Sequence, residues 1–178
     1  MEYLLGVWLK PDHWDAVAFE QLIVGAGGTR TDLVALVLSH IEHIVPNPTA
    51  PITEQTMVHV RSFFLVVAGQ GVLGGAHPDL LFQTALLSNG IVTTLTTVSR
   101  TLSRSSVAEE RTAAGLISTL VEYISVFPAR WLPQSLRAGL LEILFNPEHR
   151  QVTSARIVRL LGNIILPATV SHSVLVHL

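Results

Sequence analysis

The chain of 178 residues contains no cysteine. This absence excludes disulfide bonds, a catalytic thiolate and any zinc site with cysteine ligands. It fits a reducing compartment, and we therefore expect an intracellular protein, either cytoplasmic or nuclear. The first ten residues also lack the basic start and the small-residue cleavage site of a secretory signal peptide.

Charged residues are scarce, because they make up 13% of the chain whereas hydrophobic residues make up 49%. Such a composition predicts a folded chain that buries most of its side chains or relies on neighbours to cover them. The net charge of −2 gives no reason to expect nucleic acid or an anionic membrane as a partner. Residues 1–99 carry a net charge of −5 and residues 100–178 carry +3. The basic C-terminal half favours an acidic protein partner.

Long hydrophobic runs are missing as well. Residues 80–99 carry no charge, and Gly71 and Gly75 have the spacing of small residues between membrane helices. However, Gln83, Asn89 and many hydroxyl side chains interrupt residues 80–99. No run approaches the roughly 20 predominantly apolar residues that a membrane span requires. We therefore expect no membrane insertion.

Residues 131–166 show most clearly what the chain is built from. Apolar residues recur there at helical spacing in two runs, one ending at Phe145 and one ending before Pro167. Asn146 and Pro147 separate the runs and suit a helix start. The apolar stripe of the first run is Leu136, Leu140, Ile143 and Leu144, and that of the second is Ile157, Val158, Leu161, Ile164 and Ile165. Two stripes joined by a short turn predict an αα-hairpin.

The rest of the chain repeats this pattern of helix, glycine or proline break, and helix. The signals predict further helices at about residues 11–24, 31–44, 53–68, 78–89, 91–103, 105–127 and 168–178. We therefore predict an all-α fold in which antiparallel helix pairs stack, forming a single helical-repeat domain over residues 1–178. Repeat arrays need polar caps, yet residues 174–178 are apolar. We expect the domain to be incomplete at this C-terminal end.

Two sets of short motifs resemble known families. Residues 86–92 with Thr94 and Leu95 resemble the helix–glycine–helix junction of armadillo repeats. Residues 135–141, 166–170 and 173–175 resemble the helical region of uncharacterised mushroom-type fungal proteins that usually carry a MYND-type zinc finger. The resemblance implies an armadillo- or HEAT-like α-solenoid, a fold class used mainly for holding other proteins. The finger needs cysteines, so its zinc site is not implied here.

One motif indicates an alternative function. Gly69, Gly71 and Gly74 match the dinucleotide fingerprint and follow a strand-like apolar run at residues 63–68. This loop would make the protein a nucleotide-dependent oxidoreductase. Against this interpretation, Pro78 would fall in the second turn of the following helix, and residues 80–99 contain no acid for the ribose. We favour a loop between repeats and predict no cofactor.

The histidines do not indicate a metal site. His40 and His43 lie three residues apart on the predicted helix 31–44, but His40 falls at the apolar edge and His43 on the polar face. Metal sites need three or four convergent ligands. We therefore expect His40 to be partly buried and predict no bound metal.

The candidate partner-binding face consists of Arg137, Arg156 and Arg159, which cluster in the last predicted helix pair. No aromatic residues interleave with them, so nucleic-acid stacking is not indicated. The chain also lacks a Gly-x-Ser-x-Gly elbow. We predict a non-enzymatic protein-interaction or scaffold segment that binds an acidic protein through these arginines.

Overall fold

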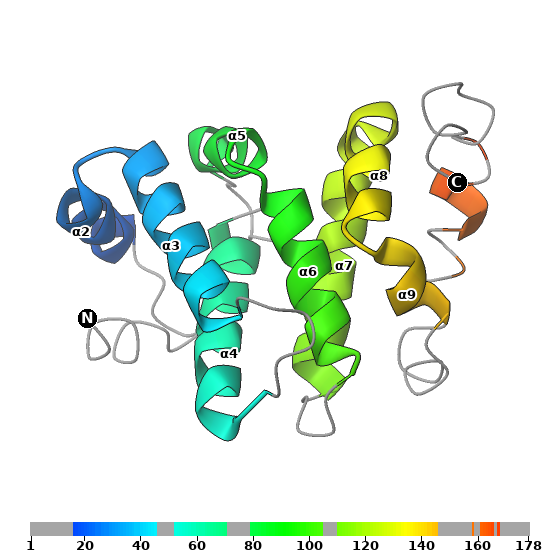
Figure 1. The fold of residues 1–178 in the computed structure, drawn as a ribbon. Coiled ribbons are helices and arrows are strands. Elements are labelled where there is room, and N and C mark those ends of the chain that lie inside the picture. The colour runs from blue at the N-terminus through cyan, green and yellow to red at the C-terminus, as the bar shows by residue number, and fades with distance from the viewer. Residues whose placement is uncertain are drawn as a thin grey trace. The chain divides into compact units, whose positions relative to one another are not determined.

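The computed structural model describes residues 16–45, 52–70, 79–104 and 110–145, together with 158, 161–165 and 167. Every regular element in these ranges is helical and none is a strand (Figure 1), which confirms the all-α prediction for this part of the chain. The elements are α2 (Ala16–Ala26), α3 (Arg30–Ile44), α4 (Glu54–Gln70), α5 (Leu80–Ser88), α6 (Ile91–Leu102), α7 (Glu110–Val126), α8 (Pro128–Arg137), α9 (Leu140–Phe145) and the π-helical turn η3 (Leu161–Ile165).

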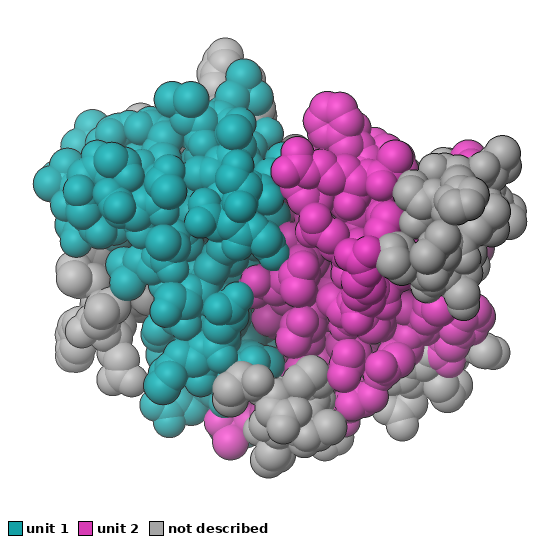
Figure 2. All heavy atoms as spheres, turned by 45° about the horizontal axis from the view of Figure 1, so that its top comes forward, with its two compact units in different colours: residues 1–46, 54–91 teal, residues 47–53, 92–178 magenta. Residues whose placement is uncertain are grey.

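The chain divides into two compact units, which Figure 2 colours separately. Unit 1 comprises Met1–Pro46 and Glu54–Ile91, and unit 2 comprises Asn47–Thr53 and Val92–Leu178. The single repeat domain expected over residues 1–178 stays a prediction.

In unit 1, α3 is the central helix because it contacts α2, α4 and α5. An apolar stripe of this helix faces the core, with Leu33, Val34, Leu38 and Ile41 buried. The opposite side of the helix is exposed and includes His43, which was predicted to lie on the polar face. Phe19 of α2 meets Phe82 of α5 edge to face, with ring centroids 5.2 Å apart. The core of unit 1 therefore joins four helices through aromatic and branched side chains.

The α2–α3 turn differs in detail from the prediction. Gly28 N–H donates to the carbonyl of Ile23 and Gly27 N–H to that of Val24, which is a Schellman ending. Thr29, not Thr31, is the N-cap of α3, and it forms a reciprocal capping box with Asp32. The helix consequently begins at Arg30, one residue before the predicted start.

The α5 boundaries agree with the sequence signals. Asp79 caps the N-terminus by accepting a hydrogen bond from Phe82 N–H. Asn89 is the C-cap, and Gly90 follows with a φ of +87°. This is the left-handed conformation for which glycine is preferred after a helix. The short helix predicted from Pro78–Asp79 to Asn89–Gly90 is therefore confirmed.

In unit 2, α8 contacts both α7 and α9. Buried hydroxyl side chains are accommodated within the helices themselves. Thr96, Thr101, Thr119 and Ser135 each donate a hydrogen bond to the carbonyl four residues earlier in the same helix. These bonds satisfy groups that would otherwise destabilise an apolar core. They explain how the threonine-rich segment α6 can be helical and largely buried.

The predicted helix over residues 131–145 is in fact two helices. α8 begins at Pro128, which occupies the first turn, and it ends at Arg137. Gly139 then has a φ of +102°, and α9 starts at Leu140. The predicted stripe of Leu136, Leu140, Ile143 and Leu144 is nevertheless buried. The apolar spacing continues through the break, so periodicity alone did not reveal it.

The second stripe of the predicted pair is only partly correct. Ile164 and Ile165 are buried as expected, but Val158 is helical and 67% exposed. A π-helical turn lies at Leu161–Ile165, where a regular helix was predicted. Pro167 is itself helical, whereas the predicted helix ended before it. The predicted helix at 168–178 and the predicted break at 146–148 lie outside the described residues.

Candidate functional site

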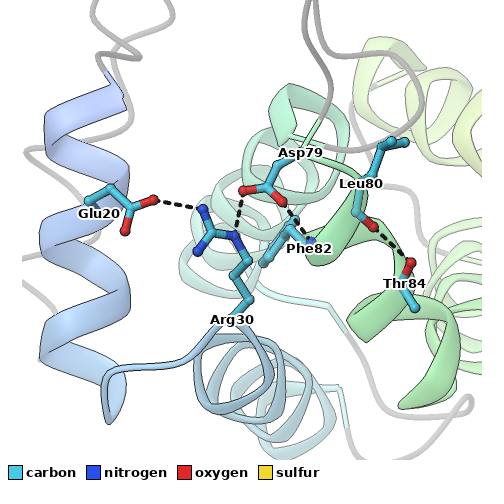
Figure 3. A network of polar contacts seen from close by, with 6 residues as sticks. All are labelled: Glu20, Arg30, Asp79, Leu80, Phe82 and Thr84. Atoms are coloured by element: carbon cyan, nitrogen blue, oxygen red, sulfur yellow. Dashed lines mark hydrogen bonds and ion pairs between the residues drawn. The ribbon is translucent and has the colours of Figure 1, made fainter.

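The most connected polar cluster of unit 1 surrounds Arg30 (Figure 3). Its Nε donates to Asp79 Oδ2 at 2.6 Å, and its terminal nitrogen Nη2 donates to Glu20 Oε1 at the same distance. Asp79 Oδ1 accepts from Phe82 N–H at 2.9 Å. One arginine at the start of α3 thus binds a carboxylate of α2 and the capping residue of α5.

Electrostatics favours the ionised form of Asp79. Burial of the carboxylate acts to raise its pKa, but the hydrogen bond from Phe82 N–H and the hydrogen bond and charge of Arg30 outweigh that effect. The pKa of Asp79 therefore lies below its ordinary value. Each member of the cluster has a role in joining helices, so we assign the cluster to the fold.

A second polar contact in unit 1 joins α3 to α4. His40 Nε2 lies 3.4 Å from His59 Nδ1, and the ring centroids are 5.3 Å apart with an interplanar angle of 68°. Both residues are half-buried, as expected for His40, whereas His43 is exposed. Sequence reasoning paired His40 only with His43 and missed His59, which lies nineteen residues along the chain.

In unit 2, a cluster around Arg100 of α6 reaches the turn between α8 and α9. Its Nη1 donates to the carbonyl of Ala138 at 3.0 Å. Its Nε lies 3.4 Å from Glu142 Oε2, an ion-pair separation without hydrogen-bond alignment. Arg104 also pairs with Glu142. Two arginines of the basic C-terminal half are therefore occupied in holding a turn.

The exposed side of α8 carries a row of four residues at helical spacing, which we call the α8 surface: Phe127, Arg130, Gln134 and Arg137. Phe127 is the N-cap residue and is 62% exposed. The guanidinium of Arg130 lies 4.3 Å from the ring centroid of Trp131, a cation–π contact that orients it. Spacings of three, four and three residues place the four side chains on one face.

Only some of the other residues predicted for functional sites are among the described residues. Arg137 is exposed, while Arg156 and Arg159 lie outside the described residues. The dinucleotide fingerprint would follow a strand at residues 63–68. These residues and Gly69 instead belong to the helix α4. Gly71 and Gly74 lie outside the described residues. A dinucleotide loop needs a strand before its glycines, so the strand that the oxidoreductase alternative requires is not present, whereas the predicted helix over residues 53–68 is confirmed as α4.

A shallow hollow lies on the exposed side of α2. It is lined by Val17, Glu20, Gln21 and Val24, and its two valines are exposed. Because it is largely open to solvent, it lacks the enclosing walls of a small-molecule pocket.

Two kinds of feature, a metal-binding group and a single membrane-spanning helix, are absent from the described ranges. These ranges contain no group of three or more His, Asp or Glu side chains placed to hold a metal ion. No single helix in them is both long and apolar enough to span a membrane, although Phe19–Ala26 and Arg30–Ile44 meet that test as a pair bent by 80°.

The chain matches no protein-family model, no curated protein and no solved structure.

Proposed function

We propose that the protein is a non-enzymatic protein-interaction segment whose antiparallel helix pairs stack as an armadillo- or HEAT-like α-solenoid. The contacts of α3 with its neighbours in unit 1, and of α8 with α7 and α9 in unit 2, support this arrangement. Short turns such as Asn89–Gly90 and Ala138–Gly139 also suit helix pairs. Solenoids of this kind present helix faces to protein partners.

The observation that carries the binding role is the α8 surface. It presents an exposed aromatic ring and two exposed arginines along roughly 15 Å of one helix. Arginine and aromatic residues are the side chains enriched where proteins bind one another. The opposite side of α8 is anchored in unit 2 through Trp131 and Leu132, which are buried. The row is therefore displayed on a rigid support.

The chemistry of the row defines the partner. Arg130 stacks on Trp131, so its planar fork of N–H groups is held in one orientation and can bind a carboxylate in two-point fashion. Arg137 repeats the charge two turns further along the helix. Phe127 adds an apolar contact at the N-terminal end. We infer an acidic protein segment that carries an apolar side chain beside its carboxylates.

Paired neutralisation of the two arginines tests this role. Arg130→Gln with Arg137→Gln lowers the net charge by two and leaves the helix intact. Each exposed charge contact contributes up to about 1 kcal/mol, so affinity for an acidic partner should fall about fivefold to thirtyfold. The measurement is quantitative mass spectrometry of proteins captured by the immobilised full chain, followed by titration of each captured protein.

A matched control separates local recognition from bulk charge. Ser39→Glu with Gln55→Glu makes the same change in net charge at two exposed sites of unit 1, and it should leave capture unchanged. Equal capture by both double variants and the unmodified chain would discard the α8 surface as the binding site. The wider basic face with Arg156 and Arg159, and the resemblance to the fungal MYND-type proteins, stay predictions.

A further inference from the structure

The His40–His59 contact has no part in the proposed partner binding, since it lies between α3 and α4 of unit 1. A hydrogen bond is one explanation for it. Hydrogen bonds from nitrogen to oxygen have donor–acceptor distances of about 2.7–3.2 Å, and the two nitrogens here are 3.4 Å apart. The contact is therefore a long hydrogen bond, in which either ring can donate according to its tautomer.

The same distance suits two ligands of one metal ion. With a metal–nitrogen distance of about 2.0–2.1 Å, a tetrahedral centre holds two imidazole nitrogens about 3.4 Å apart and their ring centroids about 5.2 Å apart. Two rings meeting head-on across the same gap would have centroids about 5.7 Å apart. The observed values are 3.4 Å and 5.3 Å. The nitrogen separation fits both arrangements, and the centroid separation is closer to that of converging ligands than to that of a head-on contact.

We propose that His40 Nε2 and His59 Nδ1 form a two-histidine binding site for a divalent late transition metal ion, namely Cu²⁺, Ni²⁺ or Zn²⁺. Neutral imidazole suits these ions, whereas Mg²⁺ and Ca²⁺ prefer oxygen ligands. Water completes the coordination, because the described residues place no third His, Asp or Glu at the pair. The bound ion joins α3 to α4 and stabilises their contact.

The half-buried position of both rings leaves the site accessible from solvent. Two protein ligands give weaker binding than the four of a structural zinc site, so the ion exchanges. Affinity follows the general order for such ligands, with Cu²⁺ bound more tightly than Ni²⁺ or Zn²⁺.

Calorimetric titration of the metal-stripped full chain with ZnCl₂, CuCl₂ and MgCl₂ tests the site. His40→Gln and His59→Gln should each lower the affinity of one Zn²⁺ equivalent by more than the roughly tenfold cost of losing an outer-shell partner. His43→Gln is the matched control, because His43 is exposed on the same helix, and it should retain that equivalent. MgCl₂ should give no binding.

A second measurement on the unmodified chain keeps the test decisive if a variant fails to fold. Zn²⁺ should slow the carbethoxylation of His40 and His59 by diethyl pyrocarbonate, mapped by peptide mass spectrometry, and leave His43 unaffected. Three results would overturn the proposal: no Zn²⁺ binding by the unmodified chain, equal binding by all variants, or loss in only one of the two histidine variants.

Discussion

Substitution of two glycines by alanine tests whether the Arg100 cluster holds the turn between α8 and α9. Gly139 and Gly90 have φ values of +102° and +87°, so alanine at either position is strained by about 1–2 kcal/mol. Their surroundings differ. A Cβ at Gly139 would lie 2.6 Å from Arg100 Cδ and 2.7 Å from its Nη1, whereas a Cβ at Gly90 would meet nothing within 4 Å.

The structure gives the size of the difference. To admit the Cβ, the arginine side chain must move and give up its hydrogen bond to the carbonyl of Ala138. Hydrogen bonds to charged groups contribute about 1.5–3 kcal/mol. Because the side chain is 22% exposed, we take the lower part of that range. Gly139→Ala should therefore cost about 2–4 kcal/mol in the free energy of unfolding, and Gly90→Ala about 1–2 kcal/mol.

Urea denaturation followed by far-ultraviolet circular dichroism measures both values. A double-mutant cycle then identifies the cause. In an Arg100→Ala background the obstructing atoms are gone, so Gly139→Ala should cost no more than Gly90→Ala does. If Gly139→Ala costs the same in both backgrounds, or no more than Gly90→Ala in the unmodified chain, then Arg100 does not hold the turn and the reasoning fails.

Three further changes test the helix ends and the core. Thr29→Ala should cost about 1 kcal/mol in urea denaturation because it removes the α3 cap, while Thr31→Ala at the neighbouring exposed site should cost less than about 0.5 kcal/mol; equal costs would place the cap wrongly. Because the pKa of Asp79 is lowered, its contribution is present above about pH 4 and is lost as the pH falls through the folded pKa, so Asp79→Asn should match the unmodified chain in acid but be less stable at neutral pH. The hydroxyl of Tyr123 is buried without a hydrogen-bond partner among the described residues, so Tyr123→Phe should leave stability within about 0.5 kcal/mol or raise it. Burial raises the pKa of Tyr123, so the unmodified chain should lose stability as pH rises above about 10, and Tyr123→Phe should lose less; identical alkaline profiles would contradict this.

Helix ends were predictable where a side chain or a glycine performs the capping locally. Asp79 and the Asn89–Gly90 pair are such signals, and both ends of α5 follow from them. The start of α3 was predicted one residue late, at residue 31, because the cap is Thr29 and Asp32 is its reciprocal partner within the helix. Gly139 was missed for a different reason. Its neighbours keep their apolar spacing across the break, and an isolated glycine is tolerated within a helix.

Contacts between helices could not be predicted from the sequence. Nothing local links His40 to His59, because they meet only after α3 packs on α4. Only one of the two arginines of the α8 surface was predicted from the sequence. Arg137 was named from the sequence, but Arg130 lay outside the predicted helix over residues 131–145, whereas α8 begins at Pro128. A helix start placed three residues too late thus left out one of two arginines on the same face.

Because charged residues are scarce, the contacts that each arginine makes can be compared one by one. Arg30 in unit 1 binds Asp79, which caps the N-terminus of α5, and Arg100 in unit 2 binds the carbonyl of Ala138 at the C-terminus of α8. Each unit therefore uses a cation to stabilise the end of another helix. The α5 dipole favours the carboxylate of Asp79 at its N-terminus, and the α8 dipole favours the cation of Arg100 at its C-terminus. Arg130 is held differently, over an aromatic ring on an exposed helix face. We therefore propose that Arg130, unlike the two arginines at helix ends, serves recognition of an acidic partner.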